Sequence, residues 1–279
     1  MTESVQTRVF KAGSTTYFNS SLFFPPAMRR DVFALYGFVR VADDFVDAVP
    51  QDADGFAEFA AGYRQALAGT PADNPIIDEF TALSRRLDFD PRWTEAFLAS
   101  MEADLSKRLY RTEDETLAYI YGSAEVIGLF MASVMRLPAE ARPAAQRLGR
   151  AMQYINFIRD AAEDTGLGRR YLPLERDGQR LLDVPDDWLP NQAWARENPE
   201  AWSAWVQGHL ARYAGWQAEA EAGYHFIPRR PRMAVRTAGD MYNWTARQIA
   251  ADPFVVFRRQ VKPRRARILW QALWNGLRG

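Results

Sequence analysis

Prolines divide this sequence into segments of ordinary helical length, and they constrain its fold more than any other feature. Proline favours helix starts and breaks helix interiors, so each proline marks a boundary. The segments between them are rich in Ala, Leu, Arg and Glu, and they seldom alternate as strands do. We therefore expect an all-α fold with about eight to ten helices. The boundaries fall at Pro25-Pro26, Pro50, Pro71 to Pro75, Pro91, Pro138, Pro143, Pro173, Pro185 to Pro190, Pro228 to Pro231 and Pro253.

The chain offers no obvious place to divide it into domains. Its 279 residues are 48% hydrophobic, which is enough for a large core. No internal repeat or low-complexity linker interrupts it. The one long irregular region, Pro173 to Pro199, is predicted to be a loop with short helices, and long loops in compact domains are often functional. We expect residues 1–279 to form a single all-α domain.

Composition excludes several classes of function. The absence of cysteine excludes disulfides and thiolate chemistry, and only two histidines occur, His209 and His225. Lys+Arg and Asp+Glu are both 35, so the totals indicate no attraction to nucleic acid, and none is expected as a partner. The N-terminus lacks the apolar stretch of a secretory signal, and the longest apolar run, Val126 to Met135, is too short to span a bilayer. We expect a cytoplasmic location.

An apolar helix is interrupted by the acidic stretch "RVADDFVD", from Arg40 to Asp47. Asp43 and Asp47 are four residues apart, so they share one helix face and repel each other unless a divalent cation lies between them. Alone the pair is a weak signal, because about four such spacings are expected by chance in this composition. Asp44 points about 100° away from Asp43, which predicts a supporting hydrogen-bond partner and not a primary ligand.

A second acidic stripe lies in "QYINFIRDAAEDTGLGRRYLP". Asn156, Asp160 and Asp164 are spaced i, i+4 and i+8, and Gln153 extends the stripe. Large apolar residues surround it, which is unusual on a solvated helix, while burying unpaired aspartates would be costly. A cation shared with a ligand resolves this conflict.

Arginines follow the second stripe. The side chains of Arg169 and Arg170 either lie in a solvated loop or bind diphosphate oxygens, which suit the guanidinium fork. Two acidic helices with nearby arginines predict a site for magnesium diphosphate. Across an all-α apolar cavity, such a site indicates ionisation of a prenyl diphosphate, because the metal would pull on the leaving group while the cavity holds the cation.

Several motifs in order make the chain resemble the squalene/phytoene synthase family. They are "GSTTYFNSSLFFPPAMRRDVFALYGFVRVADDFVD", "MEADL", "YGSAEVIG" and the second stripe, and the resemblance runs from about Gly13 to the last helices. It implies an isoprenoid synthase type helical bundle around a central apolar cavity. It also implies head-to-head condensation of two prenyl diphosphates, geranylgeranyl or farnesyl, through a cyclopropyl diphosphate intermediate in a phytoene synthase-like reaction.

The resemblance assigns roles residue by residue. The implied catalytic residues are Asp43, Asp47, Asp160, Asp164, Tyr36 and Arg159. The implied magnesium ligands are the same four aspartates with Asn156. The implied substrate-binding residues are Ser14, Thr15, Tyr17, Arg40, Tyr121, Gln153, Asn156, Arg170, Tyr242 and Arg259.

Three residues raise questions about this site. Glu125 stands where many relatives carry a small residue, which affects the shape or charge expected near that helix. Ser100 replaces a common glycine. Asp104, within "MEADL", is either a weak metal contact or a polar cap in the core.

The resemblance leaves alternatives open for the product and the cofactor. Proton loss would give phytoene or dehydrosqualene, hydride delivery squalene, and water capture a hydroxylated product of C30. Mg²⁺ is the expected ion, with Mn²⁺ as the alternative, and NADPH is expected only if the product is squalene. Since no nicotinamide fingerprint is visible, a phytoene-type product is favoured. Rival interpretations are a chain-elongating synthase, a terpene cyclase and a non-catalytic assembly factor of the same fold.

The C-terminal segment "FRRQVKPRRARILWQALWNGLRG" joins a basic stretch to an amphipathic helix with Trp270 and Trp274. Either this helix packs on the bundle, or it lies on an anionic membrane as a peripheral contact. The expected partners are prenyl diphosphate substrates, with a membrane surface as a partner only under the second alternative and downstream isoprenoid enzymes as further candidates. Packing on the bundle is the favoured alternative.

Overall fold

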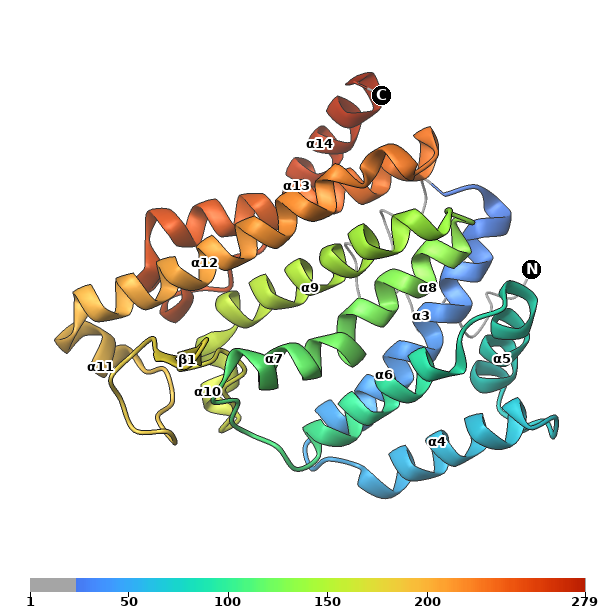
Figure 1. Cartoon of the computed structure of the whole chain (residues 1–279), viewed down its shortest axis with the longest axis horizontal. Coiled ribbons are helices and arrows are strands. Elements are labelled where there is room, and N and C mark those ends of the chain that lie inside the picture. Colours follow the sequence, from blue (N-terminus) through green and yellow to red (C-terminus); the bar gives the residue numbers. More distant parts are fainter. Residues whose placement is uncertain (1–23, 279) are drawn as a thin grey trace.

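The computed structural model describes residues 24–278, which form a helical bundle (Figure 1). The all-α prediction is confirmed, because the only strands among the described residues are two residues long. The α-helices are α3 (Pro26–Asp47), α4 (Ala53–Leu67), α5 (Pro75–Leu87), α6 (Pro91–Asp104), α7 (Glu113–Ile120), α8 (Val126–Val134), α9 (Arg142–Arg159), α10 (Ala161–Gly166), α11 (Gln192–Glu197), α12 (Pro199–Ala222), α13 (Arg229–Ala251) and α14 (Arg265–Arg278). The other helical turns are η1 (Tyr121–Glu125), η2 (Ala139–Ala141), η3 (Tyr224–Phe226) and η4 (Pro253–Phe257), and the strands are β1 (Glu175–Arg176) and β2 (Gln179–Arg180).

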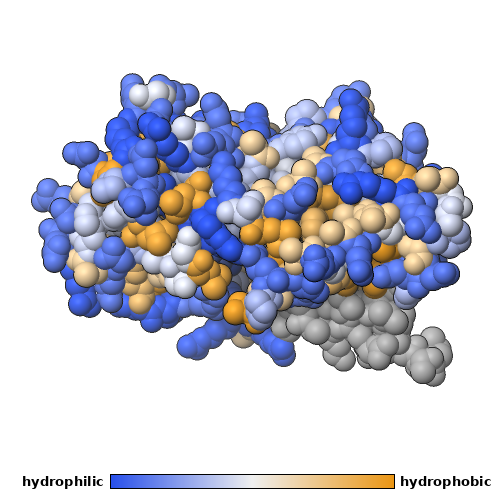
Figure 2. Space-filling model, turned by 90° about the horizontal axis from the view of Figure 1, so that it is seen from below, coloured by the Kyte–Doolittle hydropathy of each residue, from blue (hydrophilic) through white to orange (hydrophobic). Residues whose placement is uncertain are grey.

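The long helices lie side by side. Helix α9 packs between α8 and α12, while α3 contacts α5, α6 and α8 (Figure 1). Helices α4 and α5 lie along one edge of the bundle, and α14 lies against α13 at the opposite edge (Figure 1). Seen from below, the surface is mostly hydrophilic, with hydrophobic side chains in separate groups (Figure 2).

Prolines mark helix starts, as predicted. Helices α3, α5, α6, α9 and α12 each carry proline in their first turn, where its missing N–H costs nothing. Side chains also cap helix starts: Asp52 accepts from the Gly55 amide at α4, and Asn74 accepts from the Ile76 amide at α5. Local sequence therefore sets where these helices begin.

The region from Pro173 to Pro199 differs from the loop with short helices that we expected. Its first part is a hairpin in which Glu175 pairs with Arg180. Asp177 and Gly178 form the turn with φ of 50° and 73°, the left-handed conformations that tight hairpins favour. The Asp-Gly pair was a signal for this turn, but the strands around it are charged and too short to show alternation. Helix α11 is the short helix in this region.

The core consists of two hydrophobic clusters. One lies among α3 to α6 and α8, where the Phe38 and Phe80 rings stack with centroids 4.0 Å apart. The other lies among α7, α9 and α12, and includes the fully buried Tyr154 and Trp202. Both clusters bury large aromatic side chains, which contribute strongly to helix packing.

One continuous helical stretch crosses the middle of the bundle. Helices α7 and α8 are joined through the wide turn η1, and Glu113–Val134 is long and apolar enough to cross a membrane by length and composition alone. However, 56% of its most apolar window is buried within the protein. This burial suits a core helix of the bundle.

Glycines allow this central helix to approach its neighbours. A Cβ on Gly122 would lie 2.1 Å from the Ala96 carbonyl oxygen on α6, and one on Gly149 would lie 2.3 Å from the Ala124 carbonyl oxygen. Real Cβ atoms do not approach backbone so closely, so these positions keep α6, η1 and α9 in contact.

We expect Gly149→Ala to lower the free energy of unfolding by about 1–3 kcal/mol, because α9 must move away from η1. Urea unfolding measures the change. Gly215→Ala on α12 is the matched control: its Cβ would meet nothing within 4 Å, so alanine should stabilise the helix by up to about 1 kcal/mol. Equal stability of the two variants would contradict the proposed close approach.

Candidate active site

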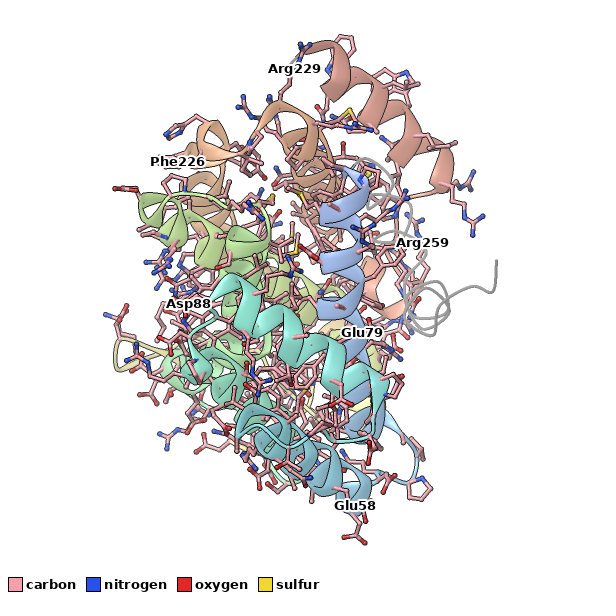
Figure 3. The ribbon with its side chains drawn as sticks, turned by 90° about the vertical axis from the view of Figure 1, so that its right-hand side faces the viewer. Glu58, Glu79, Asp88, Phe226, Arg229 and Arg259 are labelled. Carbon is pink, nitrogen blue, oxygen red and sulfur yellow. The ribbon has the colours of Figure 1, made fainter. Side chains whose placement is uncertain are left out.

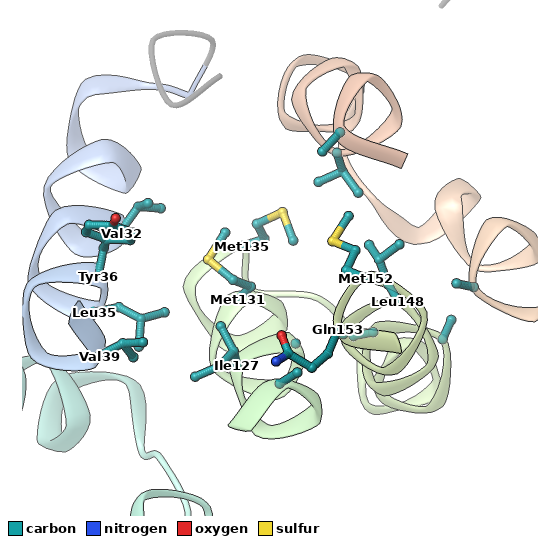
Figure 4. A pocket seen from close by; sticks show the side chains of 18 of the residues that line it. Val32, Leu35, Tyr36, Val39, Ile127, Met131, Met135, Leu148, Met152 and Gln153 are labelled. Atoms are coloured by element: carbon teal, nitrogen blue, oxygen red, sulfur yellow. The ribbon is translucent and has the colours of Figure 1, made fainter. Parts of the chain in front are cut away.

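A cavity of about 450 Å³ lies between α3, α8, α9 and the start of α13. Ligand pockets typically occupy roughly 300–1,000 Å³. Residues from Val32 to Asp43 line it on α3, so it extends about 16 Å along that helix at 1.5 Å per residue. Figure 4 shows side chains from α3, α8 and α9 pointing toward one another across it. Those labelled are Val32, Leu35, Tyr36, Val39, Ile127, Met131, Met135, Leu148, Met152 and Gln153.

One end of this cavity is polar. Asp43, Tyr119, Ser123, Gln153 and Asn156 line it there, where α3, η1 and α9 come together. The Asn156 Oδ1 and Ser123 Oγ atoms are buried and make no hydrogen bond within the described part of the chain. A buried acceptor without a partner costs about 1–3 kcal/mol, so this end suits a ligand or ion that would bind Asn156 Oδ1.

The first acidic motif occupies the last turns of α3. Asp43 accepts from Arg40 Nη1 at 3.1 Å, and Asp44 forms an ion pair with Arg40, as expected of a supporting residue. Asp47 ends the helix and lies 3.6 Å from Arg169 Nη1. Carboxylates at a helix C-terminus oppose the helix dipole, and α3 has no basic residue in its last turn. The helix alone does not stabilise these charges.

The second acidic motif spans a break between two helices. We expected one helix through Asp164, but α9 ends at Arg159 and α10 begins after Asp160. Backbone bonds from Asp160 N to Asn156 O (2.8 Å) and from Asp164 N to Asp160 O (2.9 Å) preserve the four-residue spacing. Arg159 donates to both carboxylate oxygens of Asp160, with Nε to Oδ1 at 2.8 Å.

Arg169 and Asp104 connect the two motifs. Besides its contact with Asp47, the buried Arg169 donates weakly to the Val46 and Asp104 carbonyl oxygens at 3.4 and 3.5 Å. The Asp104 carboxylate accepts from the Tyr119 hydroxyl at 2.5 Å and from the Tyr171 hydroxyl at 2.9 Å. Of the two alternatives for Asp104, these contacts support the polar cap in the core. They also fix Tyr119, which lines the cavity.

Burial and mutual repulsion perturb the carboxyl groups. Burial, followed by the neighbouring charge of Asp47, raises the pKa of Asp43 to about 7. Burial, followed by the charge of Asp160, raises the pKa of Asp164 to about 8. Each group therefore holds a proton near neutral pH unless a cation compensates its charge.

The oxygen donors of both motifs fit a hard divalent cation. Asp43, Asp160, Asp164 and the Asn156 amide oxygen are the ligand types that Mg²⁺ prefers. Among residues 24–278, no group of three or more His, Cys, Asp or Glu is close enough to hold an ion by itself. Mg²⁺ usually takes only one or two protein carboxylates and adds water and phosphate oxygens. These residues would therefore hold the ion together with a diphosphate.

Of the other expected site residues, some line the cavity and others do not. Tyr36 and Gln153 line the cavity, whereas Tyr121 does not: it is 38% exposed. Tyr119 lines the cavity in its place. Residues two positions apart on a helix are rotated by about 200° around its axis, so Tyr119 and Tyr121 face nearly opposite sides. The structure thus places Tyr121 outside the cavity lining, and its part in substrate binding stays a prediction. The helical phase of the apolar positions was the signal that could have found Tyr119.

Arg170 also differs from expectation. Its buried side chain donates to the carbonyl oxygens of Trp188 and Asp186, which fixes the following loop and keeps Arg170 away from the cavity. Burial lowers the pKa of Arg170 to about 10. Its neighbour Arg169 faces the carboxylates instead, because successive side chains in this extended segment point to opposite sides.

The remaining expected residues lie around the site or outside the described residues. Tyr242 packs against the second hydrophobic cluster and Arg259 is exposed at the edge of the molecule (Figure 3), and neither lines the cavity. Glu125 is buried beside the cavity wall, where its Oε1 lies 2.5 Å from Arg150 Nε. Its charge is thus compensated outside the cavity. Ser14, Thr15 and Tyr17 lie outside the described residues.

Sequence comparison places this architecture among known proteins. A model of the squalene/phytoene synthase family matches residues 10–267. The 15-cis-phytoene synthase of a Paracoccus species is 28% identical over 277 residues, covering 93% of this chain and 86% of that protein. The phytoene synthase of Pseudescherichia vulneris is 30% identical over 251 residues, covering 85% and 78%.

Solved structures share the fold. A dehydrosqualene synthase in complex with ligand has a TM-score of 0.76 at 18% identity, covering 97% of this chain and 94% of that one. The squalene synthase HpnC from Alicyclobacillus acidocaldarius has a TM-score of 0.70 at 22% identity, covering 93% and 94%. The expected isoprenoid synthase type fold is confirmed.

We expect the protein without divalent cations to lose thermal stability between pH 6.5 and 8.5. The folded state keeps protons on Asp43 and Asp164 that the unfolded chain, with an Asp pKa near 3.9, has already released. Stability therefore falls as pH rises through about 7 and 8. Buried His209, with its pKa lowered to about 3, has the opposite effect only below about pH 6.5.

Thermal unfolding in EDTA at three pH values measures this dependence. Asp164→Asn should make the fall shallower, whereas Asp54→Asn, exposed on α4, should leave its slope unchanged. A melting temperature that is constant or rises over this range would contradict the assignment of protons.

Proposed function

The chain belongs to the squalene/phytoene synthase family, and we propose that it joins two prenyl diphosphates head to head in a phytoene synthase-like reaction. The curated relatives are named phytoene synthases, and they align over most of this chain. The observation that carries the proposal is that Asp43 of the first motif and Asn156 of the second line the polar end of one apolar cavity. Arg169 connects the two motifs there, because its charge acts on both Asp47 and Asp164.

The polar end would bind the diphosphate groups. Asp43 and Asp47 from α3, with Asp160 and Asp164 from the α9–α10 break, would hold Mg²⁺, and Asn156 Oδ1 would be a further ligand. Bound there, Mg²⁺ would compensate the charge that develops on the leaving diphosphate. Arg40 and Arg169 lie beside the acidic residues, and their N–H groups suit phosphate oxygens.

The apolar part of the cavity would hold the hydrocarbon chains and exclude water. Its walls carry few polar groups, so an allylic cation would not be captured by solvent. The rings of Tyr36, Phe97 and Tyr119 line it, and aromatic faces stabilise a nearby cation. Tyr119 is held in place by its hydrogen bond to Asp104.

The reaction would proceed in two halves. In the first, the C1–O bond of one substrate breaks, and the C2–C3 double bond of the second attacks C1. Loss of a proton then gives a cyclopropyl diphosphate. In the second half, the remaining diphosphate leaves, the carbon skeleton rearranges, and loss of another proton gives a phytoene-type hydrocarbon. No reductant is required for this product, so NADPH is not part of the proposal.

We expect Asp43→Ala or Asp160→Ala to lower the turnover rate at least about 100-fold, because the charge on the leaving diphosphate loses compensation. Diphosphate release with Mg²⁺ measures the rate, and far-UV circular dichroism checks the fold. Asp54→Ala, an exposed aspartate on α4, is the matched control and should retain activity. Near wild-type turnover in either site variant would rule out these metal ligands.

Product analysis separates this proposal from its rivals. Geranylgeranyl and farnesyl diphosphates are supplied separately, with and without NADPH, and the extract is examined by mass spectrometry. We expect a hydrocarbon of doubled carbon number that forms equally well without NADPH. A cyclised product of unchanged carbon number, a longer diphosphate ester, or no turnover with either substrate would each contradict it.

A further inference from the structure

Helix α14 packs on α13 through one face only. Ile268 and Ala272 are buried, 5% and 2% exposed, at positions one turn apart. Further along, Asn275 Nδ2 donates to Asp240 Oδ2 at 2.7 Å and to Thr237 Oγ1 at 3.2 Å. These contacts fix which side of α14 faces the bundle.

The other side of α14 is apolar and exposed. Leu269, Trp270, Leu273 and Trp274 form this outer face, with exposed fractions of 56%, 62%, 70% and 39%. The rings of Trp270 and Trp274 stack with centroids 5.8 Å apart. Elsewhere among the described residues, the exposed large hydrophobic side chains are Val49, Tyr121 and Leu167, which lie far apart in the sequence. A grouped patch of this kind marks a contact surface.

The segment around this outer face is strongly basic. Residues 258–278 contain seven Arg or Lys and no acidic residue, although the whole chain has no net charge. Lys262, Arg264 and Arg265 are exposed and form no ion pair with any described residue. The nearby acids are already engaged: Asp240 accepts from Asn275, and Asp252 pairs with Arg258. Within residues 24–278, the positive charge therefore remains uncompensated.

These charges also destabilise α14, because they lie at its N-terminus. A helix N-terminus carries partial positive charge, and α14 has no acidic residue in its first turn. Arg264 and Arg265 at this end thus reduce the stability of α14 by itself. An anionic surface would reverse the sign of this effect, because it would pair with both the arginines and the N-terminal N–H groups.

The outer face lies close to the apolar end of the cavity. Ala234, Val235 and Ala238 of α13 line that end, while Thr237 and Asp240 of the same helix contact α14. Helix α13 therefore lies between the cavity and α14. Arg229, at the start of α13, lies at the opposite end of the molecule from Glu58 on α4 (Figure 3).

We propose that the outer face of α14 and the basic residues before it bind the surface of an anionic phospholipid bilayer. Leu269, Trp270 and Leu273 enter the headgroup boundary, and Lys262, Arg264 and Arg265 contact lipid phosphates. A second copy of the chain is a poorer occupant. In a symmetric dimer through this face, two basic segments without acidic residues would meet each other.

The use of this contact rests on the proposed function, but the binding does not. A hydrocarbon product is insoluble in water, and α13, which lines the apolar end of the cavity, packs against the helix that meets the lipid. Membrane binding can therefore be tested without substrate.

Flotation of the full chain with vesicles tests the proposal. We expect binding to vesicles of phosphatidylglycerol mixed with phosphatidylcholine, weaker binding as salt is added, and little binding to phosphatidylcholine alone. Each basic residue near such a surface contributes roughly fivefold, so R264E/R265E should weaken binding at least about 25-fold. L269Q/L273Q should also abolish flotation, because it removes two exposed apolar side chains from the outer face of α14. Both side chains point away from α13, so its packing on α14 is kept.

R92E/R196E is the matched charge control, because it makes the same change in net charge at two other exposed arginines. This variant should still float. Circular dichroism and urea unfolding check that all variants fold. The proposal is overturned if the wild type does not bind anionic vesicles, if the control loses as much binding as R264E/R265E, or if light scattering shows a dimer that only L269Q/L273Q dissociates.

The same preparations separate this proposal from the function. A chain that floats but releases no diphosphate from either prenyl substrate supports the membrane surface and contradicts the proposed reaction. A chain that turns over substrate but does not float supports the proposed reaction and contradicts the proposed membrane surface.

Discussion

Repulsion among carboxylates at the end of an apolar cavity is the constraint on which the site depends. Asp43 and Asp47 share one helix face, Asp160 and Asp164 share another, and burial raises the pKa of Asp43 and Asp164 toward or above neutrality. Either a bound proton or opposite charge offsets this cost. The chain supplies part of it through Arg40, Arg159 and Arg169, and the rest is available for a cation that arrives with a diphosphate.

The helical bundle makes this arrangement possible because each helix carries apolar residues at one end of the cavity and acidic or polar residues at the other. Toward its N-terminus α3 contributes Val32 and Leu35 to the apolar wall, and its last turns carry the acids. Helix α9 repeats this order, from Leu148 to Asn156. Close glycine contacts hold the central helix against its neighbours, so the wall stays continuous. Chemistry can then occur at the polar end while the carbon chains remain away from water.

Local patterns in the sequence predicted the helical fold and the acidic motifs, because helical spacing alone places Asp43 with Asp47 and Asn156 with Asp160. Orientation between elements was harder to predict. The choice of Arg169 over Arg170 depends on which side of an extended segment meets α3, and the choice of Tyr119 over Tyr121 on how the central helix is rotated. The ion pair between Glu125 and Arg150 joins two helices, and no short-range pattern contains it. The break at Asp160 was not indicated by the local sequence, whose four-residue spacing continues through it.

The central claim is that two prenyl diphosphates react in one cavity, and the ratio of diphosphate to hydrocarbon tests it most directly. Purified protein, Mg²⁺ and radiolabelled geranylgeranyl or farnesyl diphosphate are incubated, and released diphosphate and extracted hydrocarbon are counted in the same sample. The account predicts two diphosphates for each hydrocarbon molecule, with the label of two substrates in that molecule. One diphosphate for each product that carries the label of a single substrate would contradict it.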